Sequence, residues 1–124
     1  MSRFDGIQEG PLTIRREEVT KDLVLVFEGK SILRDPAEFL QPILIQVLDE
    51  ADSEGKRLIL DFSSLTYMNS STYTPLVKTL ERARLGNSQI TVLYDADQKW
   101  QSVSFVALTI FATGDGRVAV VGKE

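Results

Sequence analysis

The segment Arg57-Leu-Ile-Leu-Asp-Phe-Ser-Ser-Leu-Thr-Tyr-Met-Asn-Ser-Ser-Thr72 decides the fold. It opens with an apolar run of strand length, Leu58 to Leu60, which ends in Asp61. A short loop follows, and then three adjacent hydroxyl residues, 70–72. The apolar residues beyond them are spaced for one face of a helix: Tyr73, Leu76, Val77, Leu80 and Ala83. The segment therefore predicts a buried strand, a loop and a helix, with the hydroxyls at the start of the helix.

Two interpretations of these hydroxyls are open. Ser, Thr, Asn and Asp are preferred at helix N-caps, because their side-chain oxygens accept hydrogen bonds from the free N–H groups of the first turn. A phosphate would also be stabilised there by those N–H groups and by the helix dipole. Pro75 is tolerated only in a first turn, which predicts a cap at Thr72 and a helix with Pro75 as its third residue. Ser70 and Ser71 would then lie just outside the helix and stay exposed.

At these residues the sequence resembles the STAS domain, the fold of bacterial anti-sigma-factor antagonists. Asp61 matches the acidic end of the family's strand, and Asn69-Ser70-Ser71-Thr72 matches its switch motif. The resemblance implies phosphorylation of Ser70, with Ser71 and Thr72 as fallback acceptors. It also implies that Asp61 and all four motif residues contact a protein partner. Two positions depart from the family pattern: Asn69 replaces the usual Asp, and Thr72 replaces the usual Gly.

A second resemblance is to SiaC-type regulatory phosphoproteins, which are STAS-like single domains that modulate a diguanylate cyclase. Members carry Asn followed by hydroxyl residues at the helix start, as here. Glu28-Gly29-Lys30-Ser31 and the following Pro36-Ala-Glu-Phe39 are similar to another element of that group. The two resemblances imply different partners: a serine/threonine kinase of anti-sigma type with its phosphatase, or a diguanylate cyclase. A scaffold or ligand-binding module without phosphorylation is a further alternative.

Composition limits the classes of function. The chain has 124 residues, which predicts one domain at 12–124 after a lead-in at 1–11. Its net charge of −4 and the lack of a basic run argue against nucleic acid as a partner. No apolar stretch approaches the roughly 20 residues of a membrane span, and the N-terminus does not have the pattern of a signal peptide, so we expect a cytoplasmic protein. With no cysteine and no histidine, we expect no catalytic residues, no metal site, no cofactor and no enzymatic activity.

The remaining patterns predict an α/β fold with a mixed sheet of about five strands and helices mainly on one face. Strands are expected at 12–16 and 23–27 as an antiparallel hairpin, and at 58–62, 90–94 and 117–121 in parallel. Gly29 is expected to end the second strand. A helix should start at Asp35-Pro36 and end at Gly55, with a kink or a restart near Gln41 caused by Pro42.

The third predicted helix follows Asp95 and Asp97, which are expected to cap it rather than to bind a metal ion. Its aromatic residues, Trp100, Phe105 and Phe111, permit two interpretations. A stripe of this kind usually belongs to the core, but if it is exposed it indicates a partner surface or a homodimer.

Overall fold

The computed structural model describes residues 4–124, so the first three residues of the predicted lead-in lie outside the description. The elements are, in order, β1 (Gly6–Glu9), β2 (Leu12–Glu18), β3 (Asp22–Ser31), α1 (Pro36–Ser53), β4 (Arg57–Asp61), β5 (Leu65–Met68), α2 (Ser70–Leu85), β6 (Ile90–Asp95), α3 (Lys99–Val106), the 3-10 helix η1 (Ala107–Phe111) and β7 (Val118–Lys123). Each of the five predicted strands and three predicted helices is present.

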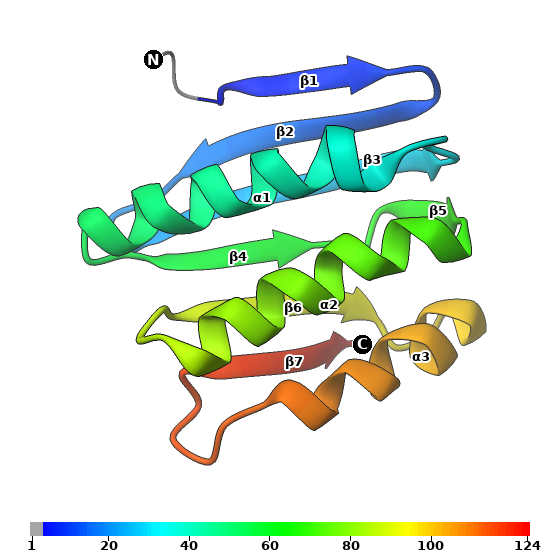
Figure 1. Cartoon of the computed structure of the whole chain (residues 1–124). Coiled ribbons are helices and arrows are strands. Elements are labelled where there is room, and N and C mark those ends of the chain that lie inside the picture. The colour runs from blue at the N-terminus through cyan, green and yellow to red at the C-terminus, as the bar shows by residue number, and fades with distance from the viewer. Residues whose placement is uncertain (1–3) are drawn as a thin grey trace.

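Among the described residues, the strands form one mixed sheet of seven in the order β1-β2-β3-β4-β6-β7, with β5 paired to the end of β3. The pairs β1–β2 and β2–β3 are antiparallel, whereas β3–β4, β4–β6 and β6–β7 are parallel. This confirms the predicted hairpin and parallel strands. Figure 1 shows α1, α2 and α3 side by side on one face of the sheet, as predicted.

The sheet has two strands more than predicted, and each escaped the sequence patterns for a local reason. Every residue of β1 is exposed, so its sequence has no alternation of apolar and polar residues. The second half of the predicted lead-in is therefore an edge strand paired with β2. Only Leu65 is buried in β5. The strand forms because β3 continues past Gly29 to Ser31, so the predicted strand end at Gly29 is wrong. The pairing of β3 with β5 shifts its register between Gly29 and Lys30.

The core lies between the sheet and its helices and has an aromatic centre. The rings of Phe27 and Phe62 stack with centroids 4.4 Å apart, and Phe105 stacks on Phe62 at 5.1 Å. Phe105 is fully buried, while Trp100 and Phe111 are half-buried and pack against the core. The aromatic residues of the third helix are therefore core residues, and they give no argument for a homodimer.

Helix α1 begins as predicted. The Asp35 carboxylate accepts a hydrogen bond from the Glu38 N–H, Pro36 occupies the first turn, and Gly55 follows the end with a φ of 66°. The predicted restart near Gln41 is wrong, because one helix runs unbroken from Pro36 to Ser53 with Pro42 inside it (Figure 1). Pro42 and Glu38 both lie on the exposed side, so water can bind the Glu38 carbonyl that lacks an N–H partner.

The third helix begins later than predicted and is not capped by either aspartate. The Asp95 carboxylate accepts from the Asp97 N–H at 2.9 Å, which closes a turn ahead of the helix. Gln98 occupies the N-cap position and makes no side-chain capping bond. The expectation that Asp95 and Asp97 cap the third helix is therefore wrong. The Asp95 carboxylate instead accepts a hydrogen bond within the turn that precedes the helix.

Gly29 should be the least replaceable of the glycines that have a positive φ. Its φ is 86°, and a Cβ atom would lie 2.0 Å from the carbonyl oxygen of Pro11, in the turn just before β2. We expect Gly29→Ala to lower the free energy of unfolding by about 2 kcal/mol or more. Gly55→Ala is the matched control, because Gly55 has a φ of 66° and open space around it, and it should cost about 1 kcal/mol. Equal urea midpoints for the two variants would contradict this explanation.

Candidate functional site

The hydroxyl motif starts α2 at the edge of the sheet where the parallel strands end (Figure 1). The cap is Asn69, whose side-chain oxygen accepts from the Thr72 N–H at 3.1 Å, so the predicted cap at Thr72 is wrong. Ser70 and Ser71 are the first two helical residues, and both are exposed. Pro75 is therefore the sixth helical residue rather than the third.

Thr72 points into the protein and is only 2% exposed. Its hydroxyl donates to the Asn69 side-chain oxygen and lies 2.7 Å from the Ser31 hydroxyl. Because the Thr72 proton goes to Asn69, the Ser31 hydroxyl donates to Thr72. The hydrogen bond joins two motifs that are 41 residues apart in the chain, the end of β3 and the start of α2.

Asn69 forms hydrogen bonds through its side-chain oxygen, its side-chain nitrogen and its backbone N–H. Its amide nitrogen Nδ2 donates to the Leu33 carbonyl at 3.0 Å, and its backbone N–H donates to the Ser31 carbonyl at 2.9 Å. An Asp at position 69 would preserve the cap but would turn a carboxylate oxygen toward the Leu33 carbonyl. The departure from the family pattern at this position thus has a structural reason, since only an amide supplies both the acceptor and the donor.

A hollow of about 380 Å³ opens beside Ser70, and we call it the Ser70 hollow. It lies between the first turn of α2 and the helix α3, where the Tyr73 hydroxyl donates to the Ser104 carbonyl at 3.0 Å. Its lining consists of Met68, Asn69, Ser70, Tyr73, Val103, Ser104 and Ala107.

An apolar strip continues from this hollow along α3 and η1. The strip consists of three exposed apolar residues, Val103 (69% exposed), Val106 (51%) and Ile110 (70%). Apolar residues at this helical spacing usually face the core, but these face water. We call these three residues the α3 strip. Sequence patterns predicted an apolar third helix but could not tell these residues from the buried ones. Exposed apolar residues grouped in this way are typical of protein-binding surfaces.

Asp61 ends β4 as predicted, but none of its hydrogen bonds reaches residues 69–72. Its carboxylate accepts from the N–H and the hydroxyl of Ser63, at 2.9 and 2.6 Å, and from the Lys123 ammonium group at 3.2 Å. Burial by itself raises the pKa of this carboxyl, but the bonds from Ser63 and Lys123 outweigh burial and hold the pKa below its usual value. Through its bonds with Ser63, the Asp61 carboxylate stabilises the turn that leads into β5.

Gln101 holds the same loop from the side of α3, a role that the sequence patterns do not predict. Its side chain is fully buried, and its amide nitrogen donates to the carbonyls of Phe62 and Leu65, both at 2.8 Å. Its amide oxygen accepts from the Asp95 N–H at 2.7 Å. The side chain thus joins α3 to the ends of β4 and β6 and to the start of β5. The only signal in the sequence is a polar residue on an otherwise apolar helix face.

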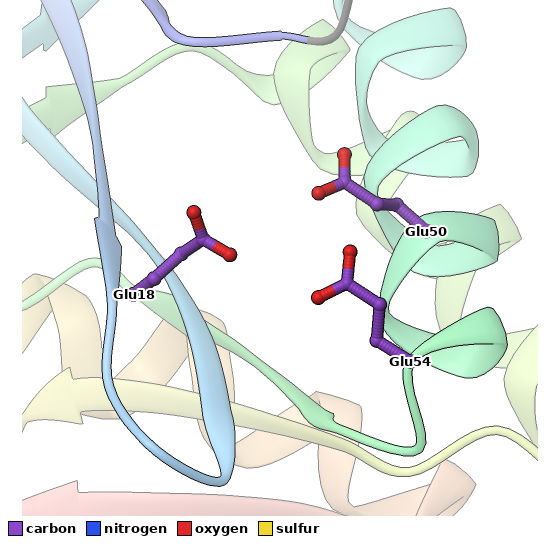
Figure 2. A group of neighbouring side chains, drawn as sticks. All are labelled: Glu18, Glu50 and Glu54. Carbon is purple, nitrogen blue, oxygen red and sulfur yellow. The ribbon is translucent and has the colours of Figure 1, made fainter.

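One group of carboxylates in the described chain converges closely enough to hold a metal ion. Figure 2 shows Glu18 reaching from the end of β2 toward Glu50 and Glu54 at the end of α1. Two cations are already placed among them: Arg16 pairs with Glu50 and Glu18, and Lys56 pairs with Glu18 and Glu54. We interpret the group as an ion-pair network that fastens the β2–β3 hairpin to α1.

Among residues 4–124, no helix combines the length and the apolar character needed to cross a membrane.

Neither a protein-family model nor a curated protein sequence matches the chain. Among solved structures, the chain is similar to an anti-sigma factor antagonist from Mycobacterium paratuberculosis. The similarity covers 86% of this chain and 90% of that chain, with 19% identity and a TM-score of 0.59. The chain has the STAS fold. The resemblance drawn from the segment around Asp61 and Asn69 is therefore confirmed at the level of fold.

In this STAS fold, the buried amide of Gln101 can be tested by substitution. We expect Gln101→Leu to lower the free energy of unfolding by about 2–4 kcal/mol, because a side chain of similar size leaves the Leu65 carbonyl and the Asp95 N–H without this partner. The Phe62 carbonyl retains a bond from the Leu65 N–H. Gln41→Leu is the control, since Gln41 is half-buried on α1 and has no side-chain hydrogen bond within residues 4–124, and it should cost less than about 1 kcal/mol. Equal losses in urea denaturation would contradict the role of Gln101.

The carboxylate of Asp61 predicts a pH dependence of stability. Because its folded pKa is lowered, its contribution is present above the unfolded pKa of about 3.9 and is lost as the pH falls through the folded pKa. We expect Asp61→Asn to be less stable than the original chain by about 1 kcal/mol at pH 7. The difference should shrink as the pH falls through the lowered pKa of folded Asp61, because the protonated carboxyl is then neutral like the amide. Urea denaturation of both proteins between pH 2 and 7 measures it, and a difference that stayed constant would refute the assignment.

Proposed function

We propose that this chain is a non-enzymatic signalling protein of the anti-sigma-factor-antagonist kind, which exchanges protein partners when Ser70 is phosphorylated. The observation that carries the proposal is the position of Ser70. Its hydroxyl is exposed, it belongs to the first residue of α2, and it lies on the rim of the Ser70 hollow next to the α3 strip. A modification there changes the charge of a surface that already has the features of a docking site.

The three hydroxyls differ in their suitability as acceptors. The Thr72 hydroxyl is buried and has partners on both sides, so a kinase would have to unfold the helix start to reach it. Ser71 is exposed but does not line the hollow. Ser70 alone among the three combines exposure with a place in the hollow, and we therefore propose it as the acceptor, with Ser71 as the fallback.

The start of α2 is also suited electrostatically to a phosphate. Its first turn contains no acidic residue, and its cap is the neutral Asn69, whereas α1 already has Asp35 and Glu38 at its start. A phosphoserine carries roughly −1.5 to −2 charges, which the helix dipole and the free N–H groups stabilise. The internal bonds of Asn69 and Thr72 would hold the helix start in place, so phosphorylation would alter the surface without refolding it.

The partners we propose are a serine kinase that also acts as the anti-sigma factor and a phosphatase that reverses the modification. An apolar partner surface seated on the α3 strip would have to bury the new charge, and would therefore dissociate. The alternative partner, a diguanylate cyclase, was suggested by the Asn at position 69. Because Asn69 is explained by its bond to the Leu33 carbonyl, that residue no longer favours one partner over the other.

Phosphopeptide mapping and partner capture test the proposal together. We expect protein isolated from its native cells to carry phosphate within the peptide that contains Ser70. Ser70→Ala should retain the dephospho partner, whereas Ser70→Asp should lose it at least tenfold in a pull-down. The matched variants Ser71→Ala and Ser71→Asp change an exposed neighbour outside the hollow, and they should bind like the original chain.

Two results would overturn the proposal. One is a phosphopeptide map of the native protein without phosphate on residues 70 or 71. The other is capture of the same partners, to the same extent, by Ser70→Ala and Ser70→Asp. Phosphate found on Ser71 alone would move the acceptor to the fallback residue and refute the assignment to Ser70.

A further inference from the structure

A second hollow lies on the other side of the loop that Asn69 holds. It has a volume of about 530 Å³, which is within the usual range of ligand sites, and we call it the α1 pocket. Its walls are the turn between β1 and β2, the loop formed by residues 32–35, and the first turn of α1. Figure 1 shows these three segments meeting at the end of the sheet where α2 begins.

The lining of the α1 pocket includes apolar side chains that are in contact with water. Ile32 is 53% exposed, while its neighbour Leu33 is only 8% exposed and belongs to the core. Phe39 is half-buried and contributes the helical side of the pocket. An exposed isoleucine beside a half-buried ring leaves apolar area in water, and covering that area with a ligand would stabilise the complex.

The charges around the pocket are unbalanced. Three carboxylates, of Glu9, Asp35 and Glu38, and one guanidinium group, of Arg34, line it, so their formal sum is −2. All four side chains are exposed, and none forms an ion pair with another residue in the range 4–124. This contrasts with the Glu18–Glu50–Glu54 group, in which Arg16 and Lys56 already neutralise the carboxylates. Asp35 caps α1 and Glu38 lies in its first turn, so the helix dipole offsets roughly half a charge of this sum. The remaining negative charge favours a ligand that brings its own positive charge.

We propose that the α1 pocket binds a segment of a protein partner in which arginine or lysine stands beside apolar side chains. The apolar residues would cover Ile32 and Phe39, and the cations would face the three carboxylates. The inference goes beyond the proposed function, because the pocket uses none of the hydroxyls of residues 70–72. The two hollows are nevertheless neighbours, because Asn69, which lines the Ser70 hollow, donates to the carbonyl of Leu33, which lines the pocket. A partner interface of ordinary size, roughly 800 Å² a side, is large enough to include both.

An NMR titration with short peptides tests this directly. The protein is the full chain carrying Ser70→Ala, so the outcome is independent of phosphorylation. The probes are two acetylated and amidated peptides, Leu-Arg-Leu-Arg-Leu and Leu-Glu-Leu-Glu-Leu. We expect the basic peptide to cause saturable amide shifts that centre on Gly10 and residues 32–39, and the acidic peptide to bind at least tenfold more weakly.

Two pairs of variants locate the binding site. Ile32→Ser should weaken the basic peptide about tenfold, whereas Val19→Ser should not, although Val19 is also 53% exposed. Glu9→Lys should weaken it several-fold, whereas Glu81→Lys, on the exposed side of α2, should not. Absence of saturable shifts in the pocket, equal binding of the two peptides, or equal effects within either pair would overturn the inference. None of these results would bear on the phosphorylation of Ser70.

Discussion

The candidate site depends on the hydrogen bonds of the Asn69 side chain. One planar amide accepts from the N–H and the hydroxyl of Thr72 and donates to the Leu33 carbonyl. It therefore caps α2 and anchors the loop after β3 at the same time. An amide can do both because it carries an acceptor and a donor a fixed distance apart, which neither a carboxylate nor a hydroxyl provides in the same geometry.

With the helix start held in this way, the hydroxyl motif has a buried residue and two exposed ones. Thr72 faces inward, where its hydroxyl completes a chain of hydrogen bonds from Ser31 to Asn69. Ser70 and Ser71 face outward on the first turn of the same helix. Because the inner bonds already hold the helix start, the outer residues can change charge without disturbing the core. Gln101, on α3, has a similar structural role: its side chain donates hydrogen bonds to the loop between β4 and β5 and holds it in place.

The two hollows at this edge differ in the chemistry that they offer. Within residues 4–124, no charged side chain lines the Ser70 hollow, which continues into the apolar α3 strip. The α1 pocket instead combines apolar side chains with excess carboxylates. The loop of residues 32–35 lines the second hollow, and Asn69, which lines the first, holds that loop. A partner that covers both would meet an apolar surface and an acidic one. This combination would restrict which partner surfaces fit, because it demands both apolar area and positive charge in one arrangement.

Local signals in the sequence determined the hairpin, the parallel strands, the start of α1 and the position of the hydroxyls at the beginning of α2. They did so because apolar period and cap chemistry act over a few neighbouring residues. Only the tertiary structure decided that β5 pairs with an extended β3, that Asn69 rather than Thr72 is the cap, and that Gln101 is a buried hub. The bond from the Thr72 N–H to Asn69 is itself local, but the Thr72 hydroxyl is turned inward to Ser31, 41 residues away. The pairing of β5 and the bonds of Gln101 likewise depend on distant residues, such as Phe62 for Gln101. A hydrogen-bonding group that is satisfied across such a distance has no mark in its own sequence neighbourhood, so the residue types were visible and their partners were not.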